Sequence, residues 1–91
     1  MIDYNRFYRY DEFTVTLKAL CAKHPALLQM ESIGKSHEGR DIWVVTATNT
    51  ATGAAADKPA YWIDANIHAS ELAGSTAALY YLESITKSYG H

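Results

Sequence analysis

The strongest fold signal in this sequence lies in residues 61–82, YWIDANIHASELAGSTAALYYL. An apolar run with Trp62 and Ile63 at its centre predicts a strand over residues 60–67. Helical spacing then predicts a helix over residues 71–88. Its apolar face is formed by Leu72, Thr76, Leu79 and Leu82, widened by Ala73, Ala77 and Tyr80. A strand followed by a helix is half of a βαβ unit, so the sequence indicates a piece of an α/β sheet.

The preceding residues predict a lead-in, a helix and a β-hairpin. Residues 1–10 show no clear period and are interpreted as an extended lead-in packed on the domain. A helix is predicted over residues 11–24, because apolar side chains recur at helical spacing and Pro25 stops the pattern. Two strand-like runs follow within residues 28–49, over 28–35 and 41–49, joined by a turn in which Gly39 supplies a positive φ. The small residues of 50–59 predict a surface loop.

Size and composition exclude several classes of protein. The chain has 91 residues, which suits one small domain, and its net charge of −2 offers no basic face for nucleic acid or for anionic lipid. No apolar run approaches the roughly 18 residues of a membrane span. No signal peptide is visible at the start, which favours a cytoplasmic protein. Cys21 is the single cysteine, so an internal disulfide is excluded and a buried apolar role is favoured.

His68 and Glu71 are the candidate metal ligands. His68 lies where the predicted strand ends, Glu71 lies where the next helix begins, and ligands of open α/β sheets sit outside the carboxyl ends of strands. Imidazole nitrogen and carboxylate oxygen both bind zinc, and two His with one Glu is a recurrent catalytic set that leaves one position for water. The alternative is a His that caps a strand and a Glu favoured near a helix N-terminus.

The residues around this pair resemble the zinc carboxypeptidase family, the carboxypeptidase A-like metallopeptidases. Three stretches carry the resemblance, and they match the family in order and spacing over roughly residues 10–90. HPALLQMESIGKSHEGRDIWVVTATN is similar to the family's first hairpin. DKPAYWIDANIHASE is similar to the strand that leads to its His-x-x-Glu zinc motif, and AGSTAALYYLESITKSYG is similar to the helix that follows.

The resemblance implies a site and a fold. His68 and Glu71 fall on the family's first two zinc ligands, for one Zn2+ per complete site. The third ligand, the general base and the arginines that hold the substrate carboxylate are expected beyond residue 91. Ser70 stands where many animal members have an arginine that helps bind substrate, which favours a bacterial-type enzyme. The implied fold is a three-layer α/β/α domain on a mixed, largely parallel sheet, of which this chain is the N-terminal part.

The expected function is a zinc-dependent metallocarboxypeptidase that hydrolyses the C-terminal peptide bond of a peptide or a peptidoglycan-like substrate. A zinc-dependent N-acyl amidohydrolase of the aspartoacylase kind is an alternative, although the hairpin sequence Glu38-Gly39-Arg40 speaks against it. A non-catalytic binding module on the same fold is another. The 91-residue chain is expected to be inactive alone, and to partner either with the remainder of the catalytic domain or with itself.

The other polar residues have plainer interpretations. His37 is expected to be solvated in the hairpin turn, and His24 to complete the apolar stripe of the first helix. Asp64 is interpreted as a hydrogen-bonded group near the sheet edge, with a smaller chance of supporting the metal site. Arg40 is interpreted as structural, paired with a carboxylate.

Overall fold

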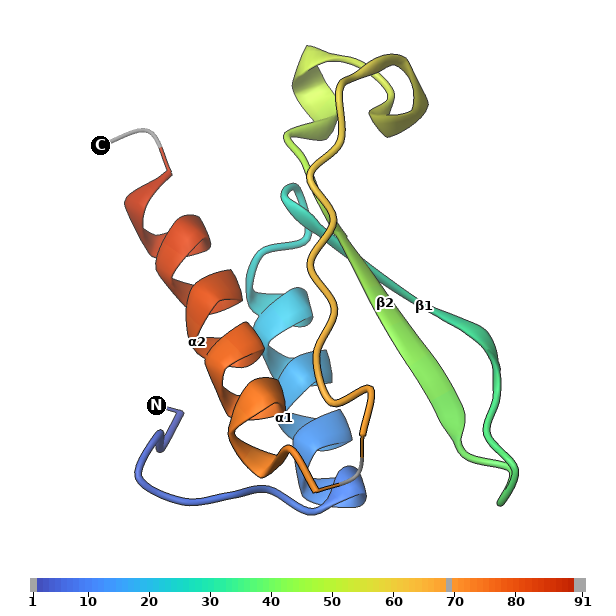
Figure 1. Ribbon diagram of the computed structural model, residues 1–91. Coiled ribbons are helices and arrows are strands. Elements are labelled where there is room, and N and C mark those ends of the chain that lie inside the picture. The colour runs from blue at the N-terminus through green and yellow to red at the C-terminus, as the bar shows by residue number, and fades with distance from the viewer. Residues whose placement is uncertain (1, 69, 90–91) are drawn as a thin grey trace. The chain divides into compact units, whose positions relative to one another are not determined.

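This computed structural model describes residues 2–68 and 70–89 (Figure 1). Within these ranges it contains two α-helices, one antiparallel β-hairpin and two short 3-10 helices, connected by coil. Their order is α1 (Tyr10–Lys23), β1 (Leu28–Lys35), β2 (Asp41–Ala47), η1 (Thr50–Thr52), η2 (Ala55–Asp57) and α2 (Leu72–Ser88). The chain divides into two compact units, residues 1–20 with 59–91 and residues 21–58. The mixed α/β class is confirmed, whereas the three layers and the parallel sheet stay predictions. None of the helices in these ranges has the length and apolar character needed to cross a bilayer.

Helix α1 begins and ends one residue earlier than predicted. Asp11 and Glu12 occupy its first turn and Lys23 its last, where each charge is favoured by the helix macrodipole. Pro25 prevents further helical turns. The predicted apolar stripe is confirmed, because the side chains buried along α1 are Leu17, Leu20 and Cys21.

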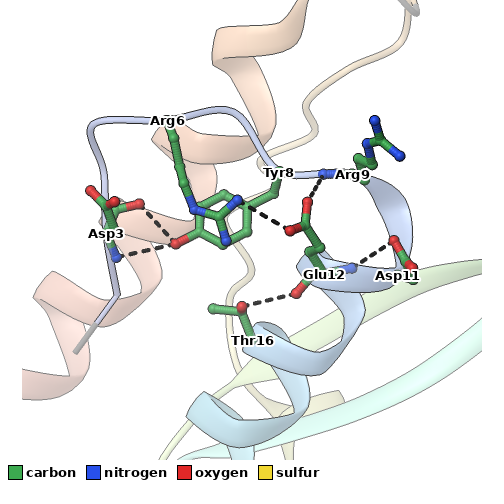
Figure 2. Close-up of polar contacts among 7 residues, drawn as sticks. All are labelled: Asp3, Arg6, Tyr8, Arg9, Asp11, Glu12 and Thr16. Carbon is green, nitrogen blue, oxygen red and sulfur yellow. Dashed lines mark hydrogen bonds and ion pairs between the residues drawn. The ribbon is translucent and has the colours of Figure 1, made fainter.

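Glu12 ties the lead-in to the start of α1 (Figure 2). Its carboxylate accepts hydrogen bonds from the backbone N–H of Arg9 at 3.0 Å and from the guanidinium of Arg6 at 3.2 Å. These two donors, Arg9 first, hold the pKa of Glu12 below its ordinary value. The Arg6 guanidinium also lies 4.2 Å from the centre of the Tyr8 ring, whose hydroxyl bonds to the backbone of Asp3. A glutamate at the third helical position that reaches back to the N-cap N–H is half of a capping box.

The β-hairpin agrees with the predicted turn. Strands β1 and β2 pair antiparallel from Leu28↔Ala47 to Lys35↔Asp41, with an irregularity before Lys35. At the turn Gly39 has φ +82° and donates its N–H to the Ser36 carbonyl at 2.9 Å. The positive φ at this position explains why the turn carries a glycine.

Strand β2 ends at Ala47 rather than at residue 49. Asn49 instead caps η1, because its side-chain oxygen accepts a hydrogen bond from the N–H of Ala51 at 3.0 Å. A local bond of this kind competes with the strand ladder. The loop is then closed by Lys58, whose Nζ donates to Thr48 Oγ1, Asn49 O and Thr52 Oγ1 at 2.7, 3.0 and 2.8 Å.

Residues 60–67 form a coil and not the predicted strand. A strand needs a neighbour to pair its backbone groups, and among the described residues the ladder joins only β1 and β2. Asn66, at φ +67°, also turns the backbone out of the extended region before the segment ends. Large apolar side chains consequently lie exposed along this coil; they are Tyr61, Trp62, Ile63 and Ile67.

Helix α2 begins one residue later than predicted, with Glu71 as its N-cap. Leu79 lies on the predicted apolar face and is 1% exposed, but Leu72 and Tyr80 are exposed, so the face was predicted only in part. The burial of Glu83 and Thr86, which lie one and two turns beyond Leu79, was not predicted. The carboxylate of Glu83 is reached by Lys87 at 3.6 Å and by the lead-in residue Tyr4 at 2.6 Å.

Candidate metal centre

His68 and Glu71 come from a tight turn between the coil and α2. The N–H of Glu71 donates to the carbonyl of His68 at 3.0 Å, and Glu71 then caps the helix with φ −89° and ψ +63°. This turn brings His68, which follows the coil, and Glu71, the N-cap of α2, close together. The spacing of three positions therefore has a structural basis: it is the spacing of one hydrogen-bonded turn.

The two side chains face each other. Nδ1 of His68 lies 3.1 Å from Oε2 of Glu71, and the backbone N–H of His68 donates to Oε1 of Glu71 at 3.2 Å. Both side chains are accessible, with exposed fractions of 74% for His68 and 49% for Glu71. In the tautomer that carries its proton on Nδ1, His68 can donate a hydrogen bond to this carboxylate oxygen.

The donor set and its spacing fit zinc. Zinc binds imidazole nitrogen and carboxylate oxygen at about 2.0–2.2 Å, so two donors on one tetrahedral ion lie about 3.3–3.6 Å apart. The observed separation of 3.1 Å differs from that range by only a few tenths of an ångström. In the part of the chain that the structure describes, no group of three metal-binding side chains occurs. The donor types and the spacing of His68 and Glu71 are thus compatible with two ligands of one zinc ion.

The backbone next to the pair contains contacts that the sequence analysis did not predict. The side-chain oxygen of Asn66 accepts a hydrogen bond from Ser75 Oγ at 3.1 Å, which joins the coil to the first turns of α2. Gly74 lies against the same coil, since a Cβ built on it would be 3.3 Å from the backbone nitrogen of Asn66. Asparagine tolerates a positive φ and glycine inside a helix is unfavourable. These two residue types were the available signals.

The remaining candidate residues take no part in the pair. Asp64 accepts a hydrogen bond from Trp62 Nε1 at 2.9 Å, which confirms that it is a hydrogen-bonded polar group. Its role in supporting a metal stays a prediction. Arg40 pairs with Glu38 at 2.8 Å, as the sequence indicated. His37 is exposed in the hairpin turn, as expected.

Two further predicted positions behave as small or half-buried side chains. Cys21 is buried, and burial raises the pKa of its thiol. His24 is half-buried just after α1 and donates its backbone N–H to Cys21 O at 3.2 Å. Ser70, next to Glu71, is exposed.

A hollow borders Glu71. It has a volume of about 610 Å³ and lies between the coil of residues 63–67 and the helix face that carries Gly74 and Tyr81. Its lining includes the polar residues Asp64, Asn66 and Glu71. The carboxylate that faces His68 is therefore also on the rim of an open, mainly apolar depression.

Comparison with known proteins identifies the family. The family model for zinc carboxypeptidases matches residues 13–91. Carboxypeptidase A1 of Rattus norvegicus is 33% identical over 88 residues, which cover 97% of this chain and 20% of that protein. Carboxypeptidase B of Astacus astacus is 33% identical over 79 residues, covering 87% of this chain and 25% of that protein. Carboxypeptidase D of Drosophila melanogaster is 31% identical over 87 residues, which cover 92% of this chain and 6% of that protein.

The match over residues 13–91 shows that this chain belongs to the zinc carboxypeptidase family. The resemblance inferred from the sequence is thereby confirmed. The chain spans about a fifth of the length of the carboxypeptidase A1 relatives.

Proposed function

We propose that His68 and Glu71 are two of the protein ligands of a catalytic zinc ion in a metallocarboxypeptidase. The observation that carries the proposal is the approach of His68 Nδ1 to Glu71 Oε2 at 3.1 Å, in accessible side chains of a chain that belongs to the zinc carboxypeptidase family. Zinc, when bound, supplies an acidified water molecule and polarises a carbonyl group.

The chain's own residues hold and orient the donors. The N–H of His68 bonds to Glu71 Oε1, so one carboxylate oxygen is fixed by the backbone while the other faces the imidazole. The accessible rim beside Glu71 leaves room for a substrate chain. A catalytic zinc usually has three protein ligands. The third ligand, the general base and the carboxylate-binding arginines belong, in this proposal, to residues outside the 91.

The complete protein would hydrolyse the C-terminal peptide bond of a peptide or a peptidoglycan-like chain, within a three-layer α/β/α domain on a largely parallel sheet. In such a sheet the coil of residues 60–67 would become a strand once neighbours supply its ladder. Its mainly apolar sequence, with Trp62 and Ile63 at the centre, suits a strand covered on both faces.

Zinc titration of the 91-residue chain tests the ligand pair. The wild-type chain should bind one zinc ion weakly, and His68→Ala and Glu71→Gln should each abolish the heat of binding in titration calorimetry. His37→Ala is the matched control, because it removes an exposed histidine of the hairpin turn and should leave the binding heat unchanged. Binding that survives His68→Ala, or that is lost in His37→Ala, would refute the assignment of the ligands.

An activity assay tests the proposed incompleteness of the site. The pure 91-residue chain with zinc should not release C-terminal residues from blocked dipeptides, because no group of three metal-binding side chains occurs among the described residues and the proposal assigns the third ligand and the general base to residues outside the 91. Zinc-dependent hydrolysis by this chain, absent in Glu71→Gln, would show that the chain forms a working site by itself.

A further inference from the structure

Asn66 has the backbone conformation of a left-handed turn two residues before His68. Its φ is +67°, and it is the one non-glycine residue with positive φ in the described ranges. This region is unfavourable for an ordinary L-residue, and asparagine tolerates it better than most because its short side chain bonds locally. The conformation turns the chain at Asn66, so it determines the direction in which His68 leaves the coil.

The side chain of Asn66 links this turn to α2 and to His68. Its Oδ1 accepts a hydrogen bond from Ser75 Oγ at 3.1 Å, and its Nδ2 lies 3.5 Å from the carbonyl oxygen of His68. Ser75 stands one helical turn after Glu71. The amide therefore joins the segment that carries the imidazole to the helix whose start carries the carboxylate.

Gly74 permits this close contact. A Cβ at Gly74 would lie 3.3 Å from the backbone nitrogen of Asn66, which is tighter than most Cβ contacts, and 3.5 Å from the Cβ of Ala65, which is an ordinary van der Waals distance. Glycine in a helix interior is less favourable than alanine. That cost is understandable if the backbone of α2 must approach the coil at this position.

We propose that Asn66 is a positioning residue for the metal-ligand pair, and that it acts through Ser75 and Gly74. The inference rests on the proposed zinc-binding role of His68 and Glu71. It assigns to Asn66 two contributions, the left-handed backbone that directs His68 toward Glu71 and the side-chain amide that fixes the coil to α2. Groups that orient metal ligands typically affect metal affinity by about 10–100-fold.

Three variants separate these contributions. Asn66→Gly keeps access to positive φ but removes the amide, Asn66→Ala removes both, and Ser75→Ala removes the partner on α2. Asn49→Gly is the matched control, because it removes an asparagine that caps another turn, in the unit of residues 21–58. Circular dichroism of each variant verifies that the helices are retained.

Zinc affinity is measured in the full 91-residue chain by competition with a chromogenic chelator, and the visible spectrum of bound Co2+ reports the geometry of the ligands. Asn66→Ala should weaken zinc binding about 10-fold or more. Asn66→Gly and Ser75→Ala should fall between it and the wild type, and Asn49→Gly should bind as the wild type does. Wild-type affinity and an unchanged Co2+ spectrum in both Asn66→Ala and Ser75→Ala would overturn the proposal.

A metal-free measurement keeps the two proposals distinguishable. Without metal, the N–H of His68 is bonded to Glu71, so its hydrogen-exchange rate, measured by NMR, reports whether the pair is held together. Exchange should be faster in Asn66→Ala than in the wild type, and an equal rate would overturn the positioning role. If His68→Ala binds zinc like the wild type while Asn66→Ala still speeds exchange, the ligand assignment fails and the positioning of the pair stands.

Discussion

Tyr4 and Glu83 form a polar contact between residues that are 79 positions apart in the sequence. The hydroxyl of Tyr4 donates to Oε1 of Glu83 at 2.6 Å, and the Tyr4 ring packs edge-on against Tyr80 with 5.1 Å between ring centres. Glu83 is 8% exposed, so its carboxylate depends on protein partners in place of water. This contact fixes the lead-in to α2.

Tyr4→Phe should lower the free energy of unfolding by about 1–3 kcal/mol, because it leaves a buried carboxylate without one of its donors. Lys87, at 3.6 Å from Glu83, compensates only partly. Tyr61→Phe is the matched control, since Tyr61 is 87% exposed, and it should change the stability by less than about 0.5 kcal/mol. Urea denaturation measures both; equal midpoints for Tyr4→Phe and wild type would contradict the importance of this contact.

Stability at alkaline pH should also depend on Tyr4. Burial, followed by the hydrogen bond and the charge of Glu83, raises the pKa of Tyr4 far above its ordinary value of 10.0. The unfolded chain therefore loses this proton near pH 10 while the folded chain retains it. The contribution of Tyr4 is complete below that pH and is lost as the pH rises toward the raised pKa.

Above about pH 10, this ionisation should reduce the wild-type unfolding free energy as the pH rises, by less than the full value of about 1.4 kcal/mol per pH unit, because solvent near the Tyr4 ring screens the charge. Tyr4→Phe should remove that part of the slope. Urea midpoints measured between about pH 9 and 11 for both proteins provide the comparison. Parallel pH profiles would show that Tyr4 ionises equally in the folded and unfolded chains.

The turn of the β-hairpin depends on the backbone angle of one glycine. Gly39 adopts φ +82° at the turn between β1 and β2. Gly39→Ala should destabilise the chain by about 1–2 kcal/mol, because an L-residue with a Cβ disfavours this region, whereas Gly39→Asn should cost less. Thermal unfolding of the two variants tests this explanation. Equal losses for alanine and asparagine would contradict it, since space around this Cβ is open.

Local elements were predictable from the sequence because their causes are local. The ends of α1 follow from Asp11, Glu12 and Pro25, and the hairpin follows from the residues around Gly39, so these bounds agree within one or two residues. Asn49 ended β2 early through a side-chain bond that strand propensity does not describe. The strand predicted at residues 60–67 depends on a neighbouring strand, which residue patterns within the segment cannot supply.

The candidate site was predictable in part for the same reason. The spacing of His68 and Glu71, with the flanking motifs, indicated a metal pair before the geometry was known. Asn66, Gly74 and Ser75 were missed, because their contacts cross from the coil to α2 and no period in the sequence encodes such an approach.

At the scale of the whole molecule, apolar surface on the coil favours association. The coil of residues 60–67 carries three highly exposed apolar side chains. They are Tyr61, Trp62 and Ile67, which are 87%, 73% and 81% exposed. Clustered exposed apolar side chains promote contact between molecules. Light scattering of the 91-residue chain should show a mass that rises with concentration.

The double variant Trp62→Ser/Ile67→Lys should reduce this association, because it removes two of the three most exposed apolar side chains of the coil and adds a charge. Val15→Lys is the control, since Val15 is an exposed apolar residue of α1 outside the coil and should leave the association unchanged. A monodisperse monomer at all concentrations of the wild type would contradict the prediction.

The exposure of Trp62 also gives the molecule an optical reporter. An indole ring in water emits at longer wavelength than one in an apolar environment, and the Trp62 ring is 73% exposed with its Nε1 bonded to Asp64. Any chain segment or second molecule that covers the coil would therefore shift its fluorescence to the blue. With the half-buried Trp43 of the hairpin replaced by Phe, the emission colour of this one ring would read out directly whether residues 60–67 are covered.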